Sequence, residues 1–222
     1  MEEAPIEYEK RKFIHSLVFP LFFLLIIWMI KLVEVTLELD FTTWGIYPLK
    51  LKGLKGILLS PLVHANFKHL MDNSVPLLVL GVAIFYFYRP VAYRVFFLTY
   101  IMVGIWVWFG GRAAYHIGAS GLVYGFASFL FISGVILREI RLLAISLLVV
   151  FLYGSLVWGI FPIKKGISWE SHMLGAIAGL ILSFYYRKHG PQRIEYDWEE
   201  EEDDISDERE SDNFENPTSS VE

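Results

Sequence analysis

The sequence predicts an all-α, polytopic membrane protein built as a bundle of six transmembrane helices. Hydrophobic residues make up 55% of the 222-residue chain and aromatic residues 17%, and the mean hydropathy is +0.47. These values are too apolar for an ordinary soluble domain. Six apolar runs, each near the ~20 residues that a helix needs to cross a bilayer, supply the spans. The lipid bilayer is therefore the expected surrounding of the chain.

The charged residues divide the chain into two parts with different properties. Residues 1–194 carry 18 Lys and Arg against 10 Asp and Glu (+8), whereas residues 195–222 carry one Arg against 14 acids (−13). We expect a cytoplasmic N-terminal segment over residues 1–12, a six-helix membrane domain over 13–190, and a disordered acidic cytoplasmic tail over 191–222. The chain has no cysteine, which excludes disulfides and thiolate metal sites.

The first apolar run is too long for a signal-peptide core and lacks a small-residue cleavage site, so we interpret it as a retained span. Residues 38–68 after it mix aromatics, lysines, glycines and prolines, which indicates an ordered interfacial loop. The six expected spans are approximately residues 13–36, 69–88, 91–109, 119–137, 142–161 and 171–186.

Basic residues predict the orientation of the bundle. If the spans alternate in direction, four basic clusters share one side, and the positive-inside rule makes that side cytoplasmic. Both termini are then cytoplasmic; the opposite loops also hold basic residues, so this orientation is the favoured one. The four clusters are Lys10-Arg11-Lys12, Arg89 with Arg94, Arg138 with Arg141, and Arg187 with Lys188.

Polar residues stand at the starts of the second, fourth and sixth spans, which run in the same direction. They are His69 and Asn73, Ser120, and His172. They should therefore meet near the outer face of the membrane, turned toward the bundle interior because exposure to lipid is costly. This set of side chains resembles that of a catalytic site.

Ser120 lies between Gly118 and Gly121, which allow a tight turn and close approach at a helix start. A serine hydroxyl is a poor nucleophile until a base takes its proton, and His172 is the natural base. Tyr124, one turn further along, could stack on the His172 ring and hold its orientation.

His69 and Asn73 are four residues apart, on one face of one helix. Their donors can point together at a developing oxyanion, assisted by the Ser120 N–H. Asp72 lies off that face and Glu170 precedes the histidine of the sixth span, so neither is well placed as a third catalytic member. The economical interpretation is a two-residue dyad.

Small residues predict how the dyad assembles. Gly121 with Gly125, and Gly175 with Gly179, form two G-x-x-x-G patterns in the fourth and sixth spans. Such spacing allows helix backbones to approach closely. We expect this packing to bring the serine and the histidine within hydrogen-bond reach.

Together these motifs resemble the rhomboid family of intramembrane serine proteases. The matching segments are His64-x4-His69-x3-Asn73, Gly118-Ala119-Ser120-Gly121-x2-Tyr124-Gly125 and His172-x2-Gly175-x3-Gly179. The resemblance covers about residues 40–187 and the first span, in the family's order and spacing. It implies a Ser120/His172 dyad, an oxyanion site at His69, Asn73 and the Ser120 N–H, and a structural role for His64.

The resemblance also implies transmembrane protein substrates, cut near the outer face of the bilayer without a metal or cofactor. It indicates a multi-pass protein of the bacterial plasma membrane with no nucleic-acid partner. The chain departs from the family in one place, because many members carry a Trp-Arg pair where this chain has Lys52-Gly53-Leu54-Lys55-Gly56.

Three other interpretations stay open at this level. An inactive relative acting as a membrane chaperone or scaffold would share the fold, although such relatives typically lack the serine or histidine. A transporter would show an inverted repeat, which is not visible here. A metalloprotease could use His64, His69 and His172, but the chain has no H-E-x-x-H motif and no carboxylate at ligand spacing.

Overall fold

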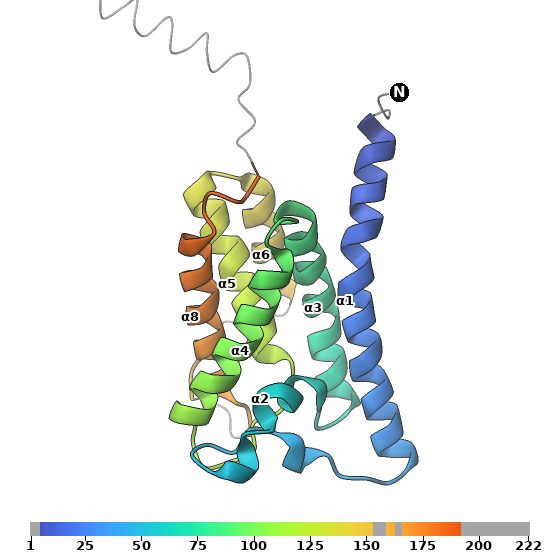
Figure 1. The fold of residues 1–222 in the computed structure, drawn as a ribbon, viewed down its shortest axis with the longest axis vertical. Coiled ribbons are helices and arrows are strands. Elements are labelled where there is room, and N and C mark those ends of the chain that lie inside the picture. Colours follow the sequence, from blue (N-terminus) through green and yellow to red (C-terminus); the bar gives the residue numbers. More distant parts are fainter. Residues whose placement is uncertain (1–4, 153–158, 163–165, 192–222) are drawn as a thin grey trace, which may run out of the picture. The chain divides into compact units, whose positions relative to one another are not determined.

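The computed structural model describes residues 5–152, 159–162 and 166–191, and within them it shows a bundle of α-helices (Figure 1). The helices are α1 (Pro5–Thr36), α2 (Gly56–Leu59), α3 (Phe67–Phe87), α4 (Ala92–Gly110), α5 (Ser120–Leu137), α6 (Ile140–Leu152) and α8 (Trp169–Tyr185). The all-α prediction is confirmed for this part of the chain. The expected acidic tail lies outside the described residues beyond Pro191.

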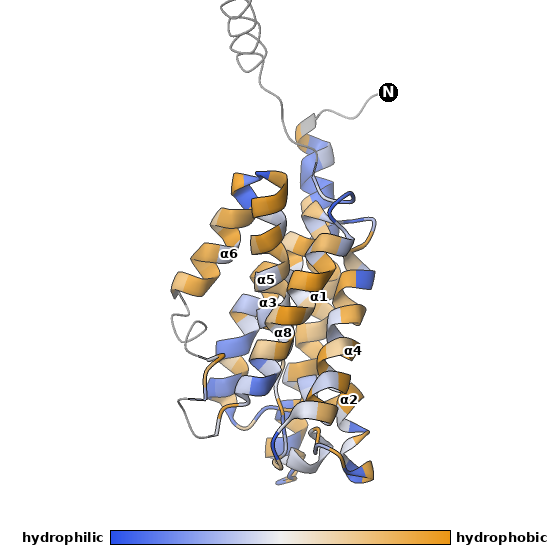
Figure 2. Cartoon of the chain, turned by 90° about the vertical axis from the view of Figure 1, so that its left-hand side faces the viewer, coloured by the Kyte–Doolittle hydropathy of each residue, from blue (hydrophilic) through white to orange (hydrophobic). Residues whose placement is uncertain are grey.

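Four helices, α1, α3, α4 and α5, are long and apolar enough to cross a bilayer. Helix α6 is also apolar, over Ile140–Phe151, but it is shorter. Hydrophobic residues fill the middle of the bundle and hydrophilic residues gather toward its ends (Figure 2). The chain is therefore an integral membrane protein. Residues 153–158 of the fifth expected span lie outside the described part.

The first helix begins earlier than expected, because α1 starts at Pro5 rather than at residue 13. The charged N-terminal segment continues the helix through pairs one turn apart, such as Glu7 with Arg11 at 3.8 Å. Glu9 also accepts a hydrogen bond from the Tyr86 hydroxyl of α3. The described part of the expected N-terminal segment is therefore helical and continuous with the first expected span.

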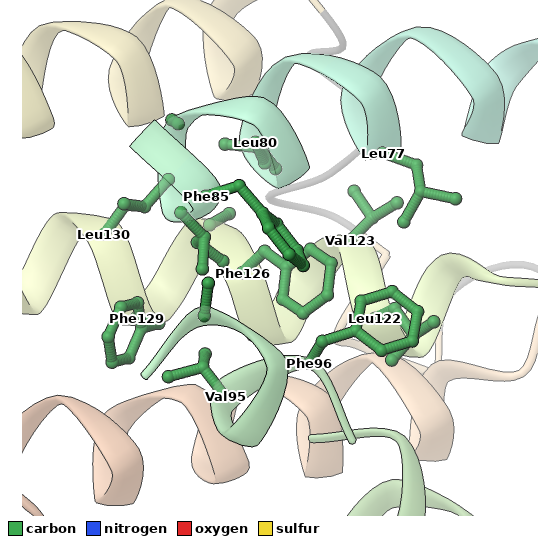
Figure 3. Close-up of a cluster of buried hydrophobic side chains, with 14 of the residues drawn as sticks. Leu77, Leu80, Phe85, Val95, Phe96, Leu122, Val123, Phe126, Phe129 and Leu130 are labelled. Atoms are coloured by element: carbon green, nitrogen blue, oxygen red, sulfur yellow. The ribbon is translucent and has the colours of Figure 1, made fainter. Parts of the chain in front are cut away.

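A central part of the hydrophobic core lies between α3, α4 and α5 (Figure 3). Large buried side chains from the three helices interdigitate there, as close packing of a protein interior requires. They include Leu77, Leu80, Phe85, Val95, Phe96, Leu122, Val123, Phe126, Phe129 and Leu130. Helix α1 stands at the edge of the bundle and packs against α3.

Helices α5 and α8 make the most extensive contact among the described helices. A Cβ atom at Gly175 would meet the carbonyl oxygen of Gly121, and one at Gly179 would meet the carbonyl oxygen of Gly125. The two G-x-x-x-G patterns therefore face each other, and their lack of side chains permits the close approach.

The segment between α1 and α3 contains the short turns η1 (Thr42–Trp44), η2 (Leu51–Gly53) and η3 (Ser60–Leu62), together with α2. Ile46 and His116 exchange two backbone hydrogen bonds of 3.0 and 2.8 Å. The Lys52 ammonium lies over the Tyr47 and Tyr115 rings, 4.4 and 5.4 Å from their centroids. These contacts dock the segment on the loop that leads into α5, at the end of the bundle where α3, α5 and α8 start (Figure 1).

Candidate active site

The starts of α3, α5 and α8 surround a cavity of about 450 Å³. The side chains expected to form the site line this cavity together: His69, Asn73, Ser120, Tyr124 and His172. Gly159, Ile167 and Ser168 of the segment before α8 line it as well. The structure therefore brings the polar residues of three distant sequence segments to one hollow.

Ser120 is the first residue of α5, and its Oγ lies 2.7 Å from Nε2 of His172. The other ring nitrogen, Nδ1, lies 2.8 Å from the carbonyl oxygen of Gly159. A carbonyl can only accept, so Nδ1 carries the proton and Nε2 accepts the Ser120 hydroxyl hydrogen. Both side chains are largely buried, with 9% of Ser120 and 8% of His172 exposed.

The Gly159 carbonyl is a contact that sequence reasoning missed. It occupies the place where a serine hydrolase often carries a carboxylate that orients its histidine. Every residue carries a carbonyl group, so no sequence signal marks this one.

Tyr124 stacks on the His172 ring, with centroids 4.2 Å apart and an angle of 11° between the planes. One face of the imidazole is therefore covered, and the ring cannot tilt freely. This is the arrangement that the one-turn spacing from Ser120 predicted.

Gly118 shapes the turn before the serine. Its φ of +105° is a backbone conformation that residues with a Cβ rarely adopt, and a Cβ there would lie 2.6 Å from Cε1 of His69. Its N–H donates to the carbonyl oxygen of Ser60 at 2.8 Å. A glycine at this position therefore lets the His69 ring lie against the turn that leads into Ser120.

His69 and Asn73 lie on the cavity side of the first turns of α3. Asn66 caps the helix by accepting the His69 N–H at 2.8 Å. The Asn73 Nδ2 donates one hydrogen to the His69 carbonyl at 3.0 Å. An amide nitrogen has two hydrogens, so the second can serve a ligand in the cavity.

His64 lies behind the cavity wall, with 1% of its surface exposed. Its Nε2 accepts the N–H of Ala119 at 3.3 Å, and its ring lies 5.0 Å from that of His69. Burial lowers the pKa of His64 to about 3, so the ring is neutral at pH 7. His64 therefore joins the segment before α3 to the residue that precedes Ser120.

A buried lysine of α1 holds the same segment. The Lys31 ammonium donates to the carbonyl oxygens of His64 and Ala65 at 2.9 and 3.2 Å. It also pairs with the Glu34 carboxylate at 2.7 Å, as a charge within a membrane helix requires. Sequence reasoning did not single out this lysine.

We expect the free energy of unfolding in detergent to fall as the pH is lowered from 7 to 4. The folded pKa of His64 lies below the ordinary value near 6.5, so the unfolded chain binds the proton more readily between these values. The contribution of His64 to the free energy of unfolding is fully present above about pH 6.5. Below that pH, the free energy of unfolding decreases by about 1.4 kcal/mol per pH unit because of this one proton. Thermal unfolding at several pH values measures the slope.

His64→Gln is the matched control, because a glutamine oxygen can accept the Ala119 N–H but does not titrate. Its free energy of unfolding should depend less steeply on pH than that of the unsubstituted protein, by the contribution of one proton, about 1.4 kcal/mol per pH unit. Equal slopes would contradict the assignment of a buried neutral His64. At pH 7, His64→Ala should unfold at a lower temperature than the unsubstituted protein, because it leaves the Ala119 N–H without its acceptor, a loss of about 1 to 3 kcal/mol.

Both carboxylates near the site are engaged elsewhere. Asp72 pairs with Lys68 at 2.7 Å, and Glu170 pairs with Arg112 at 3.2 Å. Neither is a hydrogen-bond partner of His172, whose nitrogens face Ser120 and Gly159. The arrangement is thus that of a dyad with a backbone carbonyl behind it.

Within the described residues, no group of three or more His, Asp or Glu side chains is arranged to hold a metal ion. His64 and His172 each direct Nε2 at a hydrogen donor of the chain itself. The three histidines of the metalloprotease alternative therefore do not form a ligand set here.

Comparisons with known proteins give a family match and several similar relatives. A family model described as Rhomboid domain matches residues 52–189. Uncharacterized proteins of Mycobacterium tuberculosis and Mycobacterium bovis are each 34% identical over 176 residues, which cover 73% of this chain and 71% of the relative. An uncharacterized protein of Mycobacterium leprae is 32% identical over 178 residues, covering 73% and 68% of the two chains. The polar residues around the cavity all fall within the segment that the family model matches.

Proposed function

The chain belongs to the rhomboid family, and we propose that it is an intramembrane serine endopeptidase that cleaves transmembrane segments of other membrane proteins. The observation that carries the proposal is the 2.7 Å hydrogen bond between Ser120 and His172 inside a polar cavity. The Gly159 carbonyl on the far nitrogen supports it, because it leaves Nε2 free to act as a base.

In the first half of the reaction, Ser120 Oγ attacks the carbonyl carbon of the scissile peptide while His172 Nε2 takes the hydroxyl proton. The tetrahedral intermediate then collapses. Its C–N bond breaks, and the proton on Nε2 passes to the departing amine. The product is an ester between Ser120 and the N-terminal part of the substrate.

Water completes the cycle. His172 takes a proton from the water, whose oxygen attacks the ester carbon, and the same proton returns to Ser120 Oγ as the C–O bond breaks. A carboxylic acid leaves and the free enzyme is restored. These steps use only residues of the chain and water, so we propose no metal or cofactor.

We propose that His69, Asn73 and the Ser120 N–H stabilise the oxyanion of the tetrahedral intermediate. The second amide hydrogen of Asn73 and the His69 ring lie at the cavity, and Ser120 begins α5, where helix N–H groups have no partner within the helix. Preorganised donors of this kind are most effective where negative charge develops during the reaction.

We further propose that α6 and α8 complete a six-span bundle with the four longer helices. Helix α8 has 17 residues and is thus ~26 Å long, close to the ~30 Å of a hydrocarbon core. The basic clusters favour cytoplasmic termini, and in the orientation that we propose the cavity lies near the outer face of a bacterial plasma membrane. The segment between α1 and α3 then forms an external loop beside the cavity.

Labelling with a fluorophosphonate serine probe in detergent tests the proposed chemistry. We expect the purified protein to form a stable adduct on Ser120, located by peptide mass, and Ser120→Ala to form none. A folded protein that neither labels nor cleaves a reporter membrane substrate would instead be a catalytically inactive chaperone or scaffold of the same family. Thermal unfolding of the same sample establishes that it is folded.

A further inference from the structure

A polar cluster joins the loop before α5 to the start of α8. One guanidinium nitrogen of Arg112 lies 3.3 and 3.2 Å from the two carboxylate oxygens of Glu170, and the other donates to the Ile167 carbonyl at 2.6 Å. The backbone N–H of Arg112 also donates to Glu170, at 3.3 Å. The Glu170 carboxylate is buried, with 4% of its side chain exposed, whereas 42% of the Arg112 side chain is exposed.

A second link runs beside the first. His116 Nε2 lies 3.0 Å from the carbonyl oxygen of Arg112, and Nδ1 lies 2.6 Å from the hydroxyl of Ser168. Because a carbonyl only accepts, Nε2 carries the proton and Nδ1 accepts from Ser168. The Ser168 hydroxyl lies a further 2.6 Å from that of Ser171.

Each linked segment leads directly into one half of the proposed dyad. Ser120 follows His116 by four residues, and His172 follows Glu170 by two. The facing glycines of α5 and α8 set how closely the helices approach, but a glycine contact has little directional preference. Hydrogen bonds between an arginine and a carboxylate are directional, and they strengthen when the carboxylate is buried.

We propose that the Arg112–Glu170 pair, with the His116–Ser168 hydrogen bond beside it, is a positioning clamp that holds Ser120 and His172 at reacting distance. The inference rests on the proposed peptidase function. Arg112, His116 and Ser168 also line the cavity, but the proposed role of the clamp is to act through the two helix starts. A displacement of about 1 Å between reacting groups can lower a rate by about 100-fold. A small shift of the start of α8 relative to the start of α5 would therefore have a large effect on the rate of cleavage.

Three variants test the clamp: Glu170→Gln, Arg112→Gln and the double variant. Turnover of a reporter membrane substrate is measured per active site titrated with the fluorophosphonate probe. We expect Glu170→Gln to lower kcat at least about 10-fold with KM unchanged, because register affects the chemical step rather than binding. Arg112→Gln should lower kcat further, because it leaves a buried carboxylate without its partner. The double variant should recover part of that loss of kcat.

The control is Glu139→Gln. Glu139 and Arg141 form a similar pair, with 8% and 47% of their side chains exposed, but Glu139 precedes α6 and Arg141 lies in its first turn, at the opposite end of the bundle. This variant should keep the kcat of the unsubstituted protein. If Arg112→Gln does not fold, Glu170→Gln and the double variant still decide the matter.

The outcomes separate the clamp from the peptidase function. An active unsubstituted protein together with a kcat in Glu170→Gln equal to that of Glu139→Gln would overturn the clamp alone. A lower fraction of titratable sites with normal kcat per site would also overturn it, because that result shows a purely structural role. An unsubstituted protein that neither labels nor cleaves would overturn both proposals.

Discussion

Replacing Ser120 with alanine, or His172 with alanine, is expected to reduce cleavage of a reporter membrane substrate by about 10⁴-fold or more. Each change removes one partner of the 2.7 Å hydrogen bond, the nucleophile in one case and its base in the other. The double variant should be no worse than either single variant, since the two side chains act as one unit. Initial rates in detergent at matched protein concentration measure the effect.

Ser133→Ala is the matched control for the nucleophile. Ser133 is also a buried serine of α5, with 1% of its surface exposed, but it lies 13 residues further along the helix from Ser120. Its substitution should leave the rate unchanged. Retained turnover in Ser120→Ala or His172→Ala, with thermal unfolding like that of the unsubstituted protein, would remove the dyad assignment.

The proximity of the two proposed catalytic side chains could be predicted from the sequence because two independent patterns agreed. Alternation of span direction put the starts of three helices at one membrane face, and the glycine spacing indicated close packing of two of them. Helices α3, α4, α5 and α8 also begin and end within two residues of the expected spans. Charged and polar residues interrupt the hydrophobic pattern at these helix ends, and so they mark the boundaries.

Contacts that depend on loop conformation could not be predicted. The carbonyl that orients His172 belongs to Gly159, which carries no side chain to mark a role. Glu170 was not expected to be a third catalytic member, and its carboxylate pairs with Arg112, a partner that no sequence pattern indicated. Which way a side chain at a helix start points depends on the partner that the adjoining loop supplies.

The start of α1 shows a related limit. Hydropathy located the apolar part of the helix but not its charged first turns, because polar residues interrupt a hydrophobic pattern without interrupting the backbone. Pairs such as Glu7 with Arg11 continue the helix into a polar region. Hydropathy therefore predicts the bounds of the membrane span, but it does not predict the bounds of the longer helix that contains the span.

Replacing His69 or Asn73 with alanine is expected to lower kcat by ~10² to 10³, a loss of about 3 to 4 kcal/mol, while KM changes little. Their donors are proposed to meet a negative charge that exists only as the tetrahedral intermediate forms, so substrate binding does not use them. Asn73→Asp should lose still more, because a carboxylate of the same shape would repel the oxyanion. Steady-state kinetics on a reporter substrate measures kcat and KM separately.

Ser74→Ala serves as the control for this pair, because Ser74 is the next residue of α3 but bonds to Trp28 and the Leu70 carbonyl. It should alter stability without altering kcat. A rise in KM at constant kcat in Asn73→Ala would show that the amide binds the substrate ground state, which would exclude the oxyanion role. Loss of activity in EDTA would instead require a metal, and it would return His64, His69 and His172 to consideration as ligands. Because His172 already directs Nε2 at Ser120, such a site would have to displace the hydrogen bond on which the dyad depends.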